Sequence, residues 1–211
     1  AAHKVDSLER LLKARGARPR TVLELGAGTG AVIEECARRG LGHEFTAADY
    51  SATALDYLRS RSPHITTIAG DLTDPGIALP RADLLILSHV LEHLEHPGVL
   101  LRSIATREFE YLAVEVPFED LLAGWLLAGL RDRAHNAAGH VQFFRGPDVD
   151  RLVTDAGLEI VARHRYAPVL DLDTIKFVAR KNGISALRER IHRLTAHVFP
   201  KYLGPLWTHL Y

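Results

Sequence analysis

The chain has 211 residues, and its 26 basic and 26 acidic side chains leave it without formal net charge when histidines are neutral. A chain of this length can bury a substantial core, so we expect one domain over residues 1–211. The neutral balance argues against a dedicated nucleic-acid or membrane-surface binder, which would carry a basic excess. No apolar run reaches the roughly 18 residues of a membrane-spanning helix, so no membrane span is expected.

The single cysteine, Cys36, cannot form an internal disulfide, which suits a reducing compartment. The first residues contain no hydrophobic signal segment. We therefore expect a cytoplasmic protein. The sequence contains no methionine, so we also expect the natural N-terminus to lie outside it.

A short helix over residues 6–15 is predicted first, because Asp6 and Glu9 have the spacing of a capping box before a leucine-rich face. Strands and helices then alternate. Strands are predicted at 21–25, 44–48, 65–69, 83–88 and 110–116, and helices at 30–39, 52–60 and 97–106. This alternation predicts an α/β fold with a parallel sheet, whose ligands lie outside the carboxyl ends of the strands.

Three residues mark helix ends within this pattern: Gly40 at the end of the first helix after the glycines, Ser51 before the next, and Pro97 at the start of the last. Beyond Pro117 the alternation stops. Residues 118–147 are a long connection, predicted to be a lid or substrate wall. The remaining predicted elements are a helix at 148–156 ended by Gly157, strands at 158–165 and 174–179, a helix at 184–198 and an apolar tail to 211.

The strand at 21–25 leads into a glycine-rich turn containing Gly26, Gly28 and Gly30, and a helix follows at once. Glycine lets the backbone adopt positive φ and lie against a ligand. A strand, a tight turn and a helix N-terminus form the usual cofactor site of doubly wound proteins. Gly26, Gly28 and Ala31 also match the looser dinucleotide fingerprint, which by itself is a weak signal.

Three acidic residues accompany this turn. Glu24 stands two places before Gly26, Asp49 ends the next apolar run, and Asp71 follows the third. An acidic residue in the place of Asp49 is typical of a ribose-binding group. A carboxylate beside the glycines would repel a pyrophosphate. The set therefore favours a ligand with an ammonium group, a sulfonium and a ribose.

Together with the segment 82–94, whose Glu92-His93-Leu94 looks like an "EHL" motif, these elements resemble the class I S-adenosylmethionine-dependent methyltransferases over roughly residues 20–180. The resemblance implies a doubly wound, mostly parallel seven-stranded sheet with helices on both faces and an antiparallel C-terminal strand pair. It implies S-adenosylmethionine as cofactor and S-adenosylhomocysteine as product. The implied cofactor contacts are Glu24, Gly26, Ala27, Gly28 and Gly30, with Asp49 on the ribose, Asp71 and Leu72 on the adenine, and Tyr50 and Ser88 beside them.

Residues 89–93 also match H-x-x-E-H, a zinc-protease signature in which His89 and His93 would share a helix face. Here the segment follows a buried strand instead of lying in a long helix, so we reject that interpretation. Some quinone-biosynthesis O-methyltransferases resemble this segment and hold a divalent ion with E-x-x-E-H. In this chain His89 replaces the first glutamate, which disfavours a magnesium-type site, and no metal is expected.

His140, in Gly139-His140-Val141-Gln142-Phe143-Phe144, resembles a GH-x-x-F segment of small-molecule methyltransferases. Histidine titrates near neutrality, so His140 is a candidate base for the acceptor's proton, and His89 is a second. A structural role for His140 stays open. The N-P-P-[YF] and D-P-P-Y signatures of nucleic-acid methyltransferases are absent after the fourth strand, so a small, partly apolar acceptor is expected.

Two further hypotheses stay open. One is an NAD(P)-dependent oxidoreductase that uses the looser glycine fingerprint, against which Glu24 and Asp71 speak. The other is a non-catalytic, cofactor-binding partner subunit, because a fold does not by itself establish a function. The apolar tail within residues 184–211 is expected to cover the domain, the acceptor pocket or a second copy in a homodimer.

Overall fold

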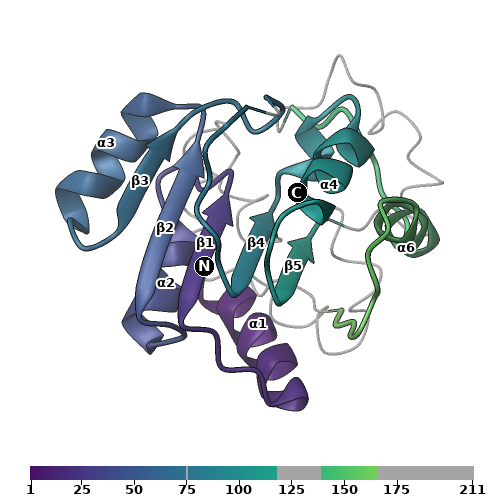
Figure 1. Cartoon of the computed structure of the whole chain (residues 1–211), viewed down its shortest axis with the longest axis horizontal. Helices are drawn as coiled ribbons and strands as arrows, with labels where there is room; N and C mark the ends of the chain where they lie inside the picture. The colour runs from purple at the N-terminus through teal and green to yellow at the C-terminus, as the bar shows by residue number, and fades with distance from the viewer. Residues whose placement is uncertain (75, 118–138, 166–211) are drawn as a thin grey trace, which may run out of the picture. The chain divides into compact units, whose positions relative to one another are not determined.

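The computed structural model describes residues 1–74, 76–117 and 139–165, in which five parallel strands form one sheet in the order β3-β2-β1-β4-β5 (Figure 1). The strands are β1 Thr21–Leu25, β2 Glu44–Asp49, β3 Thr66–Ala69, β4 Leu84–Ser88 and β5 Tyr111–Glu115. The two strands at the centre, β1 and β4, are almost entirely buried. Their continuous apolar runs are those of strands covered on both faces.

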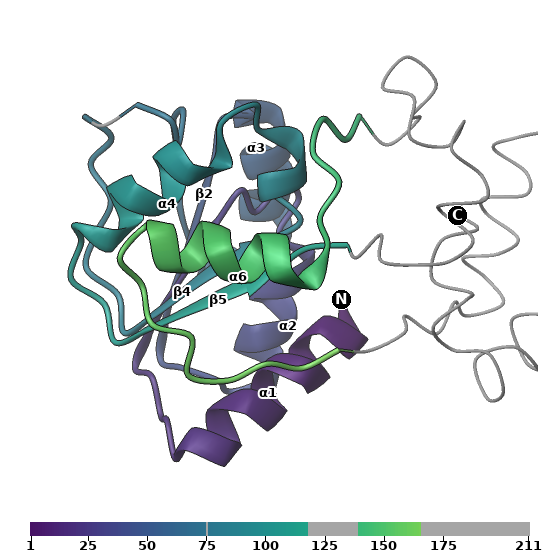
Figure 2. The same cartoon turned by 90° about the vertical axis from the view of Figure 1, so that its right-hand side faces the viewer.

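Helices cover both faces of the sheet (Figure 2). They are α1 Ala2–Arg15, α2 Ala31–Arg39, α3 Ala52–Arg61, α4 Pro97–Ala105 and α6 Gly146–Asp155, with a short 3₁₀ helix η1 at Leu91–His93. Successive strand residues point to opposite faces. Val22 and Leu84 therefore pack with α1, α2 and α3, whereas Leu23 and Leu85 pack with α4 and α6.

The predicted elements from the first strand to the fifth are confirmed, with boundaries shifted by one residue at most. Ser51 Oγ accepts a hydrogen bond from Ala54 N at 3.3 Å, Gly40 ends α2 in the left-handed conformation, and Pro97 starts α4. The first helix was predicted too short. It begins at Ala2, and Asp6 lies inside it, where its carboxylate accepts from Arg39 of α2 instead of capping a helix end.

The predicted seven-stranded sheet is wrong for the part of the chain that the structure describes, which contains five parallel strands and no antiparallel pair. Residues 158–165 do not form the expected strand. Their side chains bind helices instead: Arg163 pairs with Asp150 of α6, and His164 Nδ1 lies 2.7 Å from Ser7 Oγ of α1. The strand predicted at 174–179, the helix at 184–198 and the tail lie outside the described residues.

The predicted lid, 118–147, is described only from residue 139 onward. The described residues from Ala1 to His164 belong to one compact unit. A single domain over the whole chain stays a prediction, since residues 166–211 lie outside the description. Among the described helices, none has the length and apolar character needed to cross a membrane.

Candidate functional site

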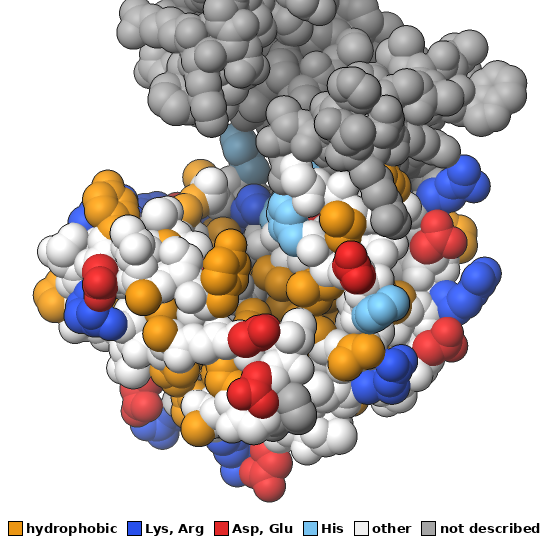
Figure 3. Space-filling view, turned by 90° about the horizontal axis from the view of Figure 1, so that it is seen from above, with side chains coloured by type: hydrophobic (Ala, Val, Ile, Leu, Met, Phe, Trp, Pro, Cys, Tyr) orange, Lys and Arg blue, Asp and Glu red, His pale blue; other side chains and the backbone are white. Residues whose placement is uncertain are grey.

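The predicted cofactor residues lie in a row along the carboxyl edge of the sheet. Asp71 follows β3, Asp49 ends β2, the glycine turn follows β1, and Ser88 ends β4. The strand arrows of Figure 1 point up, so Figure 3, seen from above, faces this edge; hydrophobic side chains gather there beside acidic and histidine side chains. The parallel register thus brings together residues that are up to 64 positions apart, from Glu24 to Ser88.

The glycine turn is hydrogen-bonded to the neighbouring strand and open on its outer side. The amides of Gly26 and Ala27 donate to Ala48 O at 2.8 and 3.1 Å. A Cβ atom on Gly26 would lie 2.5 Å from Val90 Cγ2, so only glycine fits there. A Cβ atom on Gly28 would meet nothing within 4 Å, and its φ of 53° favours glycine. The turn therefore has room for a ligand above Gly28.

Asp49 joins this turn to the next helix. Its Oδ2 accepts from Gly28 N at 2.7 Å and its Oδ1 accepts from Ser51 N at 2.8 Å, and the residue is largely buried. Backbone amides hold the carboxylate in one orientation. Each carboxylate oxygen has a further lone pair, so Asp49 can still accept from two neighbouring hydroxyls.

Glu24 lies beneath the turn, with 2% of its surface exposed. Its Oε2 accepts from Ile33 N at 2.9 Å, in the first turn of α2. The N-cap of α2 is Gly30, which has no side chain, so Glu24 satisfies an amide that a capping residue would otherwise bind. Burial raises the pKa of Glu24 to about 8, although the Ile33 amide and Lys4 act in the opposite direction.

Asp71 and Tyr50 lie at the outer end of the row. The amide and hydroxyl of Thr73 donate to Asp71 Oδ1 at 2.8 and 2.7 Å, and these bonds lower the pKa of Asp71. Tyr50 is 83% exposed, immediately after Asp49. Leu72 packs partly against the core beneath β3. An exposed ring and a carboxylate therefore stand beside the ends of β2 and β3.

Lys4 reaches the same edge from α1, a contact that sequence analysis missed. Its Nζ donates to Ser88 Oγ at 2.8 Å and lies 3.3 Å from Glu115 Oε2. Ser88 Oγ in turn donates to Glu115. Lys4 is 84 residues from Ser88 in the sequence, and no local pattern links the two.

A group of ionisable side chains surrounds η1. His89 has a φ of 58°, the one positive value among the described non-glycine residues, and its amide donates to Glu115 O. Its Nδ1 lies 2.9 Å from Oε1 of Glu92, which is completely buried. The His93 and His140 rings meet edge to face, with centroids 5.1 Å apart. Burial is the main reason that the pKa of His140 is lowered.

Backbone contacts hold His140 beside this group. The amides of Val141 and Gln142 both donate to Glu92 O, at 2.8 and 3.0 Å. Gln142 Nε2 donates to Glu95 O at 2.9 Å. The structure therefore brings both candidate bases, His89 and His140, close to Glu92, although His140 is 48 residues away from it in the sequence.

The segment containing H-x-x-E-H does not form the helix of a zinc protease. β4 ends at Ser88, and the only helical structure in residues 89–93 is the three-residue η1. Rejection of the protease interpretation is therefore supported by the local backbone.

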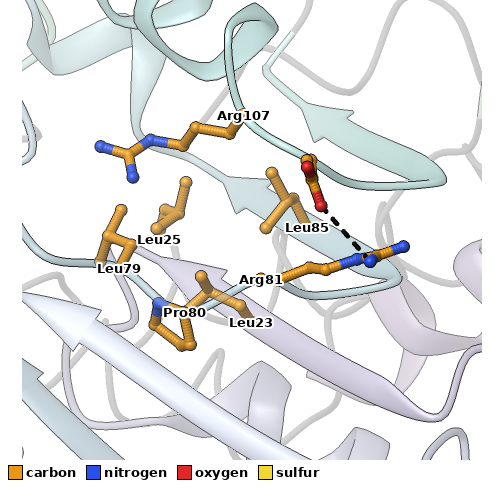
Figure 4. Close-up of a pocket in the computed structure, with 8 residues that line it drawn as sticks. Leu23, Leu25, Leu79, Pro80, Arg81, Leu85 and Arg107 are labelled. Carbon is orange, nitrogen blue, oxygen red and sulfur yellow. Dashed lines mark ion pairs between the residues drawn. The ribbon is translucent and has the colours of Figure 1, made fainter.

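A hollow on one face of the sheet is separate from these residues (Figure 4). Its lining includes none of the predicted site residues: it consists of Leu23, Leu25, Leu79, Pro80, Arg81, Leu85, Arg107 and Glu108. The described residues of the crossover between β3 and β4, which border this hollow, form no helix. Its one ion pair, Arg81 to Glu108, is exposed, so we do not place the functional site there.

The family model described as "Methyltransferase domain" matches residues 2–163. Similar solved structures include the YcgJ protein of Bacillus subtilis, with a TM-score of 0.63 and 16% identity over 88% of this chain and 80% of that one. The BH2331 protein of Bacillus halodurans has a TM-score of 0.64 and 15% identity over 93% and 85% of the two chains. A SAM-dependent methyltransferase from Archaeoglobus fulgidus has a TM-score of 0.57 and 16% identity over 95% and 88%. At these identities the likeness shows the fold alone. No curated protein matches the chain.

Proposed function

We propose that this protein moves a methyl group to an oxygen or nitrogen atom of a small-molecule acceptor by in-line displacement. The premise is that the chain belongs to the methyltransferase domain family. As a family member it is a class I S-adenosylmethionine-dependent methyltransferase. The observation that carries the proposal is the open glycine turn above Gly28, with the Asp49 carboxylate held beside it by two backbone amides.

These residues suit the cofactor's chemistry. Asp49 would accept from the two ribose hydroxyls, since each of its oxygens has a lone pair left. The turn from Gly26 to Gly30, including Ala27 and Gly28, would lie against the methionyl part. Asp71, the Leu72 backbone and the exposed Tyr50 ring would receive the adenine, with Ser88 at the other end of the row.

Glu24 supports this site from beneath, because its carboxyl group caps α2 and holds the turn in place. When bound, S-adenosylmethionine supplies a methyl group on a sulfonium, which leaves as a neutral thioether and needs no acid. The protein's main contribution is to hold the acceptor in line, and good orientation can supply roughly 7–11 kcal/mol of the barrier.

An acceptor hydroxyl must also lose its proton. We propose His140 and His89 as the candidate bases. The lowered pKa of His140 keeps its ring neutral at pH 7, and a neutral imidazole can accept a proton. If His140 is the base, His140→Ala lowers turnover far more than cofactor affinity. Unchanged turnover of that variant would remove His140 from this role.

Sequence features support a small molecule as acceptor. Ser88-His89-Val90-Leu91 stands where nucleic-acid amino-methyltransferases carry their proline signature, and the chain has no basic excess to bind a polynucleotide. We also propose a cytoplasmic location and a homodimer through residues 184–211, which lie outside the described residues. Size-exclusion chromatography with light scattering tests the dimer.

Calorimetric titration with S-adenosylhomocysteine, with NADH as the parallel control, tests the proposed function. Binding of the first alone, followed by methyl transfer in an acceptor screen, is the expected result. Binding of NADH alone would favour the oxidoreductase. Failure with both would leave the non-catalytic partner subunit as the better hypothesis.

A further inference from the structure

We propose that Glu92, His93 and His140 bind one divalent transition-metal ion of the zinc class at the carboxyl edge of the sheet. One ligand atom from each of these three side chains lies within 4.8 Å of the others. They come from η1 and from the segment after residue 138, so the fold brings them together. The sequence led us to expect no metal, and the burial and arrangement of these side chains are the reason to depart from that expectation.

Glu92 points to a cation most directly. The residue has no exposed surface, and neither of its carboxylate oxygens makes a hydrogen bond to the residues that the structure describes. His89 Nδ1 approaches Oε1 to 2.9 Å but makes no hydrogen bond to it. A buried carboxylate without hydrogen bonds is costly unless it is paired or coordinates a metal. A bound cation would give the buried Glu92 carboxylate the interaction partner that it lacks.

The two histidines are held in a way that suits metal ligands. His93 Nδ1 lies 3.2 Å from Gly139 O, so a proton on Nδ1 can be donated to that carbonyl and leave Nε2 as the free lone pair. A carbonyl oxygen that accepts from the other ring nitrogen commonly fixes the tautomer of a metal-binding histidine. The Val141 and Gln142 amides bind Glu92 O and so hold the neighbouring His140 beside η1.

The ligand set selects the class of metal. Two imidazoles and one carboxylate suit zinc and similar ions, whereas magnesium prefers oxygen ligands alone. Three protein ligands leave a fourth tetrahedral position for water or a substrate, as in catalytic zinc sites. Bonds of about 2.0–2.1 Å place ligand atoms roughly 3.3 Å apart, so small side-chain movements from the observed spacing would close the site.

The role of the ion rests on the proposed function. In the fourth position, an acceptor oxygen would bind the ion and lose its proton more easily, because a Lewis acid lowers the pKa of a bound hydroxyl. A metal-bound His140 could not accept that proton, which would leave His89 as the candidate base. Metal binding itself does not depend on methyl transfer and is measured separately.

The first experiment uses the full 211-residue chain without a histidine tag, freed of metal with a chelator and titrated with Zn²⁺ against a chromophoric competitor. We expect one equivalent to bind with sub-micromolar affinity. Substitution with Co²⁺ should give the intense visible absorption of a four-coordinate ion. Absence of one-equivalent binding, or a spectrum of octahedral Co²⁺ only, overturns the proposal.

Variants test the ligands. Glu92→Gln, His93→Ala and His140→Ala should each weaken Zn²⁺ binding by at least tenfold, and the exposed His64→Ala should bind as wild type does. Binding that survives in all three variants overturns the proposal. Far-UV circular dichroism checks folding, and if Glu92→Gln does not fold, the two histidine variants decide. Titration with S-adenosylhomocysteine runs in parallel: its failure while Zn²⁺ still binds would refute the proposed function and leave the metal site standing.

Discussion

Replacement of Glu24 by glutamine should remove a pH dependence of stability. Glutamine keeps an oxygen that accepts from Ile33 N but cannot ionise. The pKa of Glu24 rises from its ordinary value of 4.5 to about 8 in the folded protein, mainly through burial, with Glu115 and Asp49 adding to the rise and Lys4 opposing it. Between these values the unfolded chain has released the proton and the folded chain still holds it. The wild type should therefore lose stability as pH rises.

The size of the effect follows from this shift. While only the folded state holds this proton, the free energy of unfolding falls by about 1.4 kcal/mol for each unit by which pH rises. Between pH 5 and pH 7 the free energy of unfolding should therefore fall by about 2.5 kcal/mol. Glutamine cannot ionise, so the free energy of unfolding of Glu24→Gln should not fall in this way. The difference between variant and wild type should therefore grow by about 2.5 kcal/mol between pH 5 and pH 7. Urea unfolding of the cofactor-free protein at several pH values measures the difference.

Glu35→Gln is the matched control. Hydrogen bonds from Arg38 and Arg39 lower the pKa of Glu35 to about 2. A lowered pKa stabilises the fold above the unfolded value and loses that stabilisation only as pH falls through the folded value. Glu35→Gln should therefore shift stability by nearly the same amount at pH 5.5 and pH 7. If Glu24→Gln gives a curve parallel to wild type, the argument from Glu24 burial is wrong.

Three further predictions concern the proposed cofactor site and its surroundings. Asp49→Ala should leave the fold intact and weaken S-adenosylhomocysteine binding at least tenfold in calorimetry. The reason is that charge-assisted hydrogen bonds contribute about 1.5–3 kcal/mol each. Wild-type affinity would refute the ribose assignment. Gly28→Ala should lower cofactor affinity and destabilise the fold by about 1 kcal/mol. Gly26→Ala should lower the melting temperature more, because its Cβ would lie 2.5 Å from Val90 Cγ2. Equal melting temperatures for the two variants would contradict this. Lys4→Ala should lower the free energy of unfolding by about 1 kcal/mol, and adding Glu115→Gln to this variant should restore part of that free energy. Additive losses in the double-mutant cycle would show that Lys4 and Glu115 are not coupled.

Several features of this site could be predicted without coordinates because they are local. A glycine needed for a tight turn, a serine that caps the following helix and an acidic residue at a strand end all act within a few residues of themselves. Gly26, Ser51 and Asp49 accordingly lie where the sequence placed them. The position of these residues relative to one another could also be predicted, because parallel pairing brings the carboxyl ends of successive strands to the same edge of the sheet.

Other features could not be predicted because they depend on how much water each group loses. The sequence left open whether Glu24 contacts the cofactor or only orients backbone amides, and it gave no sign that the packing of α2 over β1 buries the carboxyl group and raises its pKa. Residues 158–165 have an apolar and polar pattern that suits a strand, but their hydrogen bonds go to α1 and α6. Burial and partner choice are properties of the whole fold.

The sequence by itself determined the α/β alternation and the glycine turn, because periodicity and turn chemistry depend on residues that are close together in the chain. The class of enzyme followed from the resemblance of these motifs to a known family. Only the tertiary structure decided that Lys4 joins Ser88 and Glu115, and that His140 joins Glu92 and His93. Lys4 is 84 positions from Ser88, and His140 is 47 positions from His93. Their meeting depends on the geometry of the folded chain, which no local pattern records.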